Sequence, residues 1–419
     1  MSTNLQDAQR RGPSATAHLI RSHELYPHVK VGDLVLRKNQ AAVLHRRRTY
    51  NVFNASTIPT DAFSNACFSD IRLQGCDVVD GITLRLTVNN ASGAALGQWF
   101  AMWSWTILSH VEVLAENGST VLERIEPDHL IREWAKLDRQ RHLAVHKGLT
   151  GERSGSVASP PPVIADGGSR TILIPLLGCM LDSHEIAPFA LAGPIIIRTH
   201  FRGSAVFTGP YTATQIPNGT AGVTVSAFDA VVTAHQYDQS ERQVLARRYA
   251  LAGLKTPPLD VRFARPGFQR TSEAVTSTSS FLNIRLSSVQ GLVTSMNIII
   301  RDLALLGTAT FYFPEAVDLL DEKGASVYGQ PLSYDLLVAT ECRDQGVYTD
   351  DYDMPKIVPV PIGGEGAEHS GAISGYLPMS GNHQLAIKFA YTGDMEVTVI
   401  YRTVSHVRIE KSHVTVHAS

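Results

Sequence analysis

Short stretches of alternating apolar and polar residues dominate the chain. Residues 82–88 and 282–286 alternate with a period of two, which predicts strands that turn one face toward a core. Residues 195–197 and 397–401 are β-branched runs of strand length. Because these strands are short and separated by turn residues, the pattern favours β-sandwiches or barrels over alternating strands and helices.

Three brief segments carry helical signals instead. Residues 127–137 bear an apolar stripe at helical spacing, with Pro127 near the first turn. Residues 238–241 have the spacing of a capping box and lead into a second expected helix. Residues 331–340 place leucines on one side of a third. The predicted fold class is therefore all-β, with short helices in the loops between strands.

One block of the sequence occurs twice. Aligned without gaps, residues 111–121 match residues 317–327. The same alignment continues as far as Asp138, which matches Asp344. Both copies predict a strand, a tight turn at Asn-Gly or Lys-Gly, a second strand and a short helix. The glycine would supply the positive φ that such a turn needs. We infer a duplication, because units of this size can each bury their own core.

The duplication sets the expected domain limits. A chain of 419 residues suits two domains of roughly 200 residues each. Outside the block the two copies agree loosely. Residues 174–175 parallel residues 377–378, and the strand-like run 195–197 that follows the first pair parallels the run 397–400 that follows the second. The expected segments are an N-terminal arm (1–31), a first unit (32–205), a linker or long loop (206–224), a second unit (225–412) and a C-terminal tail (413–419).

Composition narrows the class of protein. Hydrophobic residues make up 44% and charged residues 18% of the chain, as in folded globular domains. The net charge of -2 argues against a protein that wraps nucleic acid. Four cysteines lie apart, with no C-x-x-C pair, so we expect reduced thiols and neither a zinc site nor a disulfide framework. We also expect no signal peptide and no membrane span.

Four ordered motifs point to a known family. They are a Glu-Trp pair closing the first hairpin block (133–134), Ile-Pro-Leu followed by Ala-Pro-Phe-Ala-Leu (174–176 and 187–191), an Asp-x-x-Glu-Arg step (238–242) and a Ser-Gly strand (370–376). In this order they resemble the double jelly-roll major capsid proteins of nucleocytoplasmic large DNA viruses, polinton-like viruses, virophages and membrane-containing phages. The virus group stays open.

The resemblance implies a fold and a function. The fold would be two tandem eight-stranded jelly rolls, and the function would be to form homotrimeric, pseudo-hexagonal capsomers that tile an icosahedral virion. Implied partners are the chain itself, minor capsid and penton proteins, and an internal membrane through the N-terminal arm, with no sequence-specific nucleic acid. Assembly would occur in the host cytoplasm or nucleus. The alternatives are a penton or minor capsid protein, or a two-domain jelly-roll carbohydrate-binding protein.

Candidate metal ligands have weak support. His129 with Glu133, and His142 with His146, are spaced by four residues, which puts each pair on one helix face. We favour solvated residues of a charged helix. Three carboxylates in 350–353 lack the glycine and distal glutamate of a calcium loop, so an exposed acidic loop is the better interpretation.

Other candidates were weighed in the same way. The arginines of 46–48 suit an ion-paired edge strand or a subunit contact better than phosphate binding. Arg10-Arg11 suits a partner of the arm and plain solvation about equally well. Residues 183–185 lack a nucleophile elbow. Three tryptophans between 99 and 105 are expected on one core strand. Four glycosylation triplets occur, at Asn54, Asn90, Asn117 and Asn218. We expect no enzyme, and no catalytic, cofactor-binding or metal residues.

Overall fold

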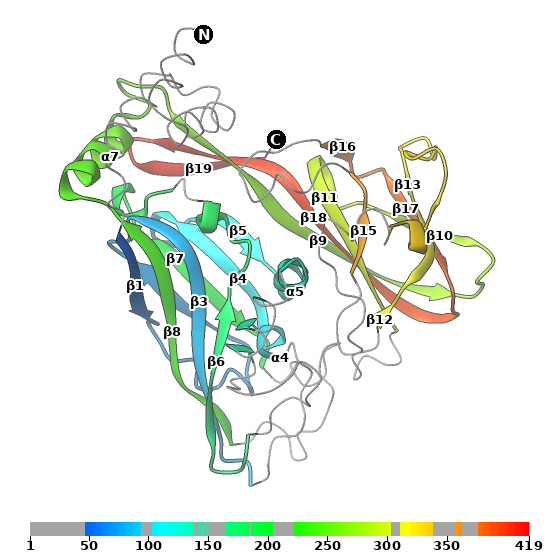
Figure 1. The fold of residues 1–419 in the computed structure, drawn as a ribbon, viewed down its shortest axis with the longest axis horizontal. Coiled ribbons are helices and arrows are strands. Elements are labelled where there is room, and N and C mark those ends of the chain that lie inside the picture. Colours follow the sequence, from blue (N-terminus) through cyan, green and yellow to red (C-terminus); the bar gives the residue numbers. More distant parts are fainter. Residues whose placement is uncertain are drawn as a thin grey trace.

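The computed structural model describes residues 47–93, 103–137, 141, 144–145, 148–149, 164–183, 186–203, 222–302, 311–337, 357–362 and 376–418. These residues form two β-sandwiches side by side (Figure 1), the first on the left and the second on the right. Long strands run from the second sandwich across the top of the first. Within the described ranges, no helix has the length and apolar character needed to cross a membrane.

The first sandwich consists of two four-stranded antiparallel sheets. One has the order β1-β8-β3-β6, formed by Arg47–Asn54, Val223–Gln236, Val78–Asn90 and Ser169–Pro175. The other has the order β2-β7-β4-β5, formed by Cys67–Leu73, Ile195–Phe201, Leu108–Ala115 and Thr120–Ile125. The chain changes sheet at every connection except the β4–β5 hairpin. This connectivity is that of a jelly roll.

The second sandwich repeats the same connectivity. Its four-stranded sheet has the order β10-β17-β13-β14, formed by Phe281–Arg285, Gln384–Phe389, Pro314–Leu320 and Leu332–Ser333. Its seven-stranded sheet contains β9, β11, β12, β15, β16, β18 and β19, formed by Leu259–Val275, Gln290–Asp302, Phe311–Tyr312, Ile357–Val360, Leu377–Ser380, Gly393–Glu410 and His413–Ala418. Here β13–β14 is the counterpart of the β4–β5 hairpin, and β11–β12, β15–β16 and β18–β19 are further connections that stay within the seven-stranded sheet. The predicted all-β fold of two jelly rolls is confirmed.

The repeated block occupies the same place in both jelly rolls. Val111 on β4 pairs with Ile125, and its counterpart Val317 on β13 pairs with Leu332, so the two hairpins differ by one residue in register. Gly118 has a φ of 93° and Gly324 a φ of 81°. Both turns therefore use the left-handed conformation for which glycine was expected.

The strand pairing differs from three expectations. Residues 225–236 lie in β8, which pairs with β1 and β3 of the first jelly roll and not with the second. Residues 413–418 form β19, which pairs with β18. The structural counterpart of 195–197 is 384–389, because β7 and β17 hold the same position beside β4 and β13. On this pairing we propose limits near 47–236 and 259–418 for the two units.

Helices lie in the connections, as predicted. They are α4 (Trp103–Thr106), α5 (Pro127–Ala135), α7 (Gln239–Leu251) and α8 (Tyr334–Leu337), with 3-10 turns η2 (Glu116–Gly118), η3 (Met180–Ser183) and η4 (Pro188–Ala190). Helix α7 begins directly after Asp238, although the Asp238 side chain makes no capping hydrogen bond. Trp103 and Trp105 lie in α4, so the expected tryptophan strand was wrong.

Two apolar cores follow from this arrangement. The second core lies inside the second jelly roll. The first extends beyond its own sandwich, because Val261 of β9, Val407 and Ile409 of β18 and Val414 of β19 are packed into it. Cys67, Cys76 and Cys179 are free thiols, and the last two are buried. Burial raises the pKa of Cys76 to about 11, with a further contribution from Asp77, so this thiol stays protonated.

Candidate functional site

An exposed apolar edge runs along the first jelly roll. Tyr50 and Val52 of β1, Ile58 of the following loop and Phe68 of β2 are large hydrophobic side chains that are between 48% and 68% exposed. Strands β1 and β2 are the outermost strands of their sheets and meet at a bridge between Ala55 and Ile71. We call Tyr50, Val52, Ile58 and Phe68 the apolar edge. An outermost strand with apolar side chains is a surface suited to contact with another chain.

The arginine run begins this edge. Arg48 forms an ion pair with Asp80 of β3 at 2.8 Å and lies 5.9 Å from the ring of Tyr50. His235 of β8 lies 3.7 Å from the same Asp80 carboxylate. Arg48 thus lies on the ion-paired edge strand that its sequence position suggested.

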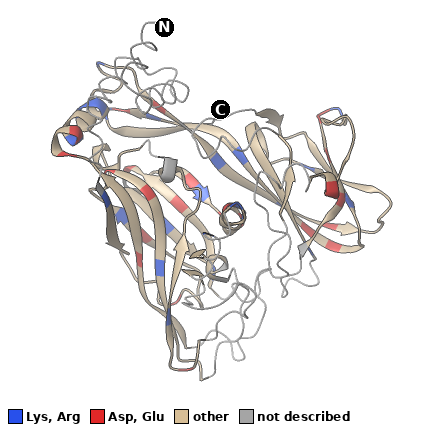
Figure 2. Ribbon diagram, viewed as in Figure 1, with Lys and Arg blue, Asp and Glu red and all other residues tan. Residues whose placement is uncertain are grey.

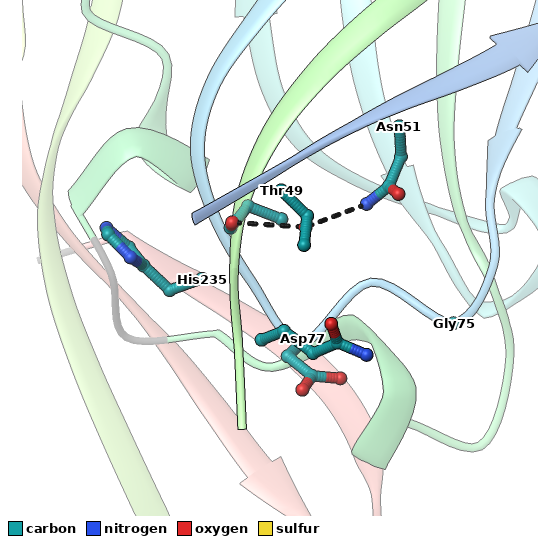
Figure 3. A pocket seen from close by; sticks show the side chains of 7 residues that line it. Thr49, Asn51, Gly75, Asp77 and His235 are labelled. Carbon is teal, nitrogen blue, oxygen red and sulfur yellow. Dashed lines mark hydrogen bonds between the residues drawn. The ribbon is translucent and has the colours of Figure 1, made fainter. Parts of the chain in front are cut away.

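A small polar pocket lies beside β1 and the end of β8 (Figure 3). Thr49, Asn51, Asp77 and His235 are among its lining residues. Asp77 is buried and accepts a hydrogen bond from the Tyr237 amide at 2.6 Å, while Arg242 of α7 forms an ion pair with it at 3.1 Å. Asp77 therefore fixes the connection between the jelly rolls to the first of them, which accounts for its burial without a ligand.

The junction between the jelly rolls is centred on α5, which lies between them in Figure 1. Every residue from Pro127 to Ala135 is buried, including four that carry charged or titratable side chains. The sequence predicted a solvated charged face here, and that prediction was wrong. The second jelly roll covers this face with side chains that are more than 130 residues away in sequence.

Asp128 is the centre of one ionic group in this junction. Its carboxylate accepts hydrogen bonds from Arg270 at 2.5 Å and from Arg301 at 3.2 Å, and Arg301 also contacts Glu396 at 3.1 Å. Burial alone would raise the pKa of Asp128, but Arg301 and Arg270 outweigh it and lower the pKa below its usual value. Asp128 is therefore a buried anion held between strands β9 and β11.

A second ionic group lies further along α5. Glu133 accepts hydrogen bonds from Arg132 at 2.6 Å and from Arg402 of β18 at 3.1 Å. Arg132 also donates to Ser295 and Asn297 of β11, at 2.9 and 3.1 Å. One arginine therefore joins the helix to β11 and the other joins it to β18.

His129 lies between these two groups. Its Nε2 donates to the Gly267 carbonyl oxygen at 3.0 Å, and burial together with Arg402 and Arg132 lowers its pKa to about 3. The candidate metal pair His129 and Glu133 is thus committed to protein contacts. His129 Nε2 and Glu133 Oε1 already join the two jelly rolls.

Glu123 of β5 is a buried acid beside the junction. It accepts the Met180 amide at 2.8 Å and lies close enough to Arg402 and Arg265 to feel their charge. Burial nevertheless raises its pKa to about 7. Glu123 is thus a buried carboxyl whose pKa is raised into the physiological range, and nothing in the local sequence marked it.

The remaining sequence candidates divide by position. Asn90 is buried and donates to the Ile164 carbonyl oxygen at 2.9 Å, whereas Asn54 is exposed. Several others lie outside the described residues: His142, His146, His184, Glu185, Asn218, the acidic loop 350–353 and the arm 1–31. Acidic and basic residues are both scattered over the described ribbon (Figure 2).

The connectivity and the junction define a class of protein, the double jelly-roll proteins. No family model and no curated protein sequence matches the chain. Solved structures do. The PBCV-1 capsid model aligns with a TM-score of 0.64 and 10% identity over 90% of this chain and 98% of that one. The Faustovirus major capsid protein aligns with a TM-score of 0.60 and 9% identity over 87% of this chain and 90% of that one. A Sputnik virophage chain aligns with a TM-score of 0.52 and 9% identity over 89% of this chain and 88% of that one.

At this level of identity the comparisons establish the fold. The chain has the double jelly-roll fold of viral major capsid proteins, along nearly its whole length. The resemblance found in the sequence motifs is confirmed at the level of fold.

Proposed function

We propose that this chain is a major capsid protein whose homotrimers form pseudo-hexagonal capsomers of an icosahedral virion. The observation that supports this most is the pair of identically connected jelly rolls held side by side through α5. Three such chains around one axis would carry six similar units, so a threefold assembly would have a nearly sixfold outline. Blocks of that outline can tile a flat face with one repeated lateral contact.

The apolar edge is the proposed contact between neighbouring chains of the trimer. Strand β1, which carries two of its four side chains, lies on the side of the first jelly roll away from the second (Figure 1). Stable association of whole subunits needs a buried apolar centre with a polar rim. Arg48 and Asp80 at the start of the edge would belong to that rim.

Further partners follow from a capsid role. We propose that the arm 1–31 contacts minor capsid proteins or an internal membrane, and that penton proteins close the vertices of the shell. The protein would reside in the virion after assembly in the host cytoplasm or nucleus.

Light scattering coupled to size-exclusion chromatography tests the proposal. One chain has a mass of 45.6 kDa, so a trimer would have about 137 kDa. Val52→Asp should shift the mass from trimer to monomer, because the new carboxylate would be buried without a partner. Val121→Asp is the matched control: Val121 is an exposed valine on β5, at the other side of the same jelly roll, and the trimer should persist.

The outcomes separate two claims. A wild-type monomer at every concentration and salt, with no hexagonal particles in negative stain, contradicts the capsomer. A Val52→Asp variant that stays trimeric like Val121→Asp contradicts the apolar edge as the trimer contact.

A further inference from the structure

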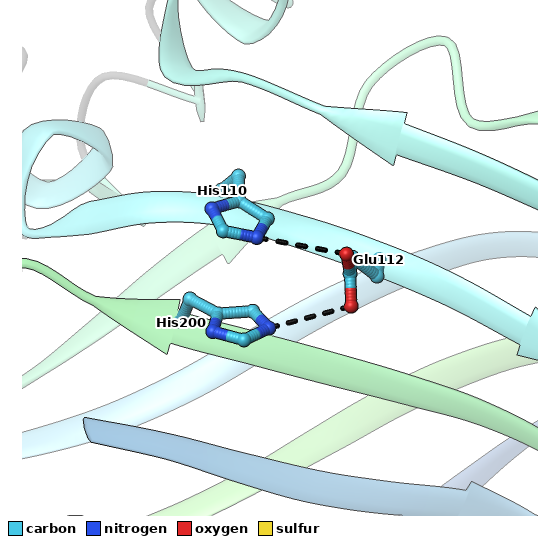
Figure 4. A group of neighbouring side chains, drawn as sticks. All are labelled: His110, Glu112 and His200. Carbon is cyan, nitrogen blue, oxygen red and sulfur yellow. Dashed lines mark hydrogen bonds and ion pairs between the residues drawn. The ribbon is translucent and has the colours of Figure 1, made fainter. Parts of the chain in front are cut away.

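Two histidines and a glutamate face one another on the outer side of the first jelly roll (Figure 4). His110 and Glu112 lie two residues apart on β4, so their side chains leave the same face of the sheet. His200 of the neighbouring β7 is directly opposite His110 in the register. All three side chains are partly exposed, at 14%, 19% and 27% respectively.

The distances in this cluster are wider than those of good hydrogen bonds. Glu112 Oε1 lies 3.7 Å from His110 Nε2, and Glu112 Oε2 lies 3.4 Å from His200 Nε2. Hydrogen bonds from nitrogen to oxygen have lengths of about 2.7–3.2 Å. Tetrahedral zinc with ligand bonds of about 2.0–2.2 Å separates its ligand atoms by roughly 3.3–3.6 Å. The two glutamate–histidine distances are therefore close to the spacing that a metal ion would require, and all three ligand atoms lie within 4.8 Å of one another.

The nearby cations are already paired. Arg198 of β7 donates to both carboxylate oxygens of Asp70, at 2.8 and 2.9 Å. Arg124 of β5 donates to Glu126 at 2.9 Å. The Glu112 carboxylate, which lies between these arginines in the register, instead faces the two imidazoles.

The contact between His110 and Ser109 allows a tautomer of His110 with a free ring nitrogen. Its Nδ1 lies 3.2 Å from the Ser109 hydroxyl oxygen. When Nδ1 donates that proton, Nε2 presents its lone pair toward the Glu112 carboxylate. Two electron-rich groups that face each other in this way repel unless a proton or a cation lies between them.

We propose that His110, Glu112 and His200 form a binding site for a divalent transition-metal ion, with zinc as the best match. Two imidazoles and one carboxylate are a common zinc ligand set, and a fourth position would be left for water. The two rings are stacked at 4.1 Å with 14° between their planes. Each must rotate about its Cβ–Cγ bond to point at a shared ion, and that torsion has a broad range.

A bound ion would join β4 to β7 at the outer surface of the sheet. It would bind the folded protein and not the unfolded chain, so zinc should raise the apparent stability as its concentration exceeds Kd. The site does not depend on the proposed capsid function.

Titration calorimetry on chelator-treated full-length protein tests the site. Wild-type protein should bind one zinc ion per chain. Glu112→Gln and His200→Gln should each weaken zinc binding at least about tenfold, because loss of a group that only orients a ligand already weakens binding by about 10–100-fold. His417→Gln is the matched control. His417 stacks on His406 across β18 and β19, at 5.3 Å and 16°, and should leave zinc binding unchanged.

Cobalt gives a second readout, because tetrahedral Co²⁺ absorbs strongly in the visible region. The absorption should appear with wild type and His417→Gln and be absent from Glu112→Gln. Absence of zinc binding to the wild type would overturn the proposal. So would equal affinity in wild type and Glu112→Gln, since any ion would then be bound elsewhere.

Discussion

Asp128→Asn tests the buried junction directly. Asp128 is fully buried, and its two oxygens accept hydrogen bonds from Arg270 of β9 and Arg301 of β11. The substitution keeps the shape of the side chain and removes its negative charge. The two guanidinium groups would then lack that anion, while the packing around the side chain would stay the same. The variant therefore separates the contribution of the charge to the free energy of unfolding from the contribution of packing.

The expected loss is large. Arg301 is 2% exposed and would keep Glu396 as an ionic partner, while Arg270 is 30% exposed. Removal of one member of a buried ion pair typically costs about 3–5 kcal/mol. Asp260→Asn is the matched control. Asp260 pairs with Arg408 at 3.0 Å with both side chains well exposed, so solvent screens the interaction and little stability should be lost.

Urea unfolding followed by tryptophan fluorescence measures the difference. Trp134 lies on α5 itself and packs edge-to-face on Trp105 at 6.0 Å, so the signal reports on the junction. All variants should be compared at one protein concentration, because association stabilises the folded state. A loss for Asp128→Asn no greater than that for Asp260→Asn would refute the view that this charge holds the jelly rolls together.

Two further changes test other parts of the structure. Glu123 has a pKa of about 7 in the folded protein, against an ordinary value of 4.5, so its ionisation opposes folding. Stability should therefore fall by up to about 3 kcal/mol as pH rises from 4.5 to 7. Glu123→Gln should flatten this part of the urea-midpoint profile, and equal slopes would contradict the assignment. Gly267→Ala should cost about 1–3 kcal/mol in urea unfolding, because a Cβ there would lie 2.5 Å from the Tyr401 ring. Gly81→Ala in β3 meets nothing within 4 Å, and an equal cost there would count against this explanation.

Short-range features were predictable from the sequence. Hairpin turns at Gly118 and Gly324 and the start of α7 after Asp238 depend on residues within a few positions of each other. Period-two patterns such as 82–88 depend only on which side of a strand faces a core. The repeated block then predicted two jelly rolls, because the same local signals recur in the same order in both halves of the chain.

The junction was not predictable in this way. The partners in its ion pairs are far apart in the sequence. Asp128 is 142 residues from Arg270 and 173 residues from Arg301, and Glu133 is 269 residues from Arg402. Locally, the charges of α5 look like the solvated face of an amphipathic helix. Their burial is decided by strands of the other jelly roll, and no local pattern carries that information.

Strand β8 was misplaced for a similar reason. The repeated block marks the middle of each unit, whereas β8 returns to the first sheet after the long connection 204–221. Its residues alternate like any other strand. Only the pairing with β1 and β3 assigns it to a jelly roll, and pairing over such a distance cannot be deduced from one strand alone.

The long strands of the second jelly roll also have a consequence for synthesis. Val407, Ile409 and Val414 complete the core of the first jelly roll, although they lie within 15 residues of the C-terminus. On the ribosome, residues 47–236 emerge first, and part of their apolar surface stays uncovered until residues 407–414 have been translated. An unfinished or C-terminally truncated chain would therefore be defective at its N-terminal half as well. On the proposed function, only a chain translated past Val414 can present finished surfaces to its neighbours.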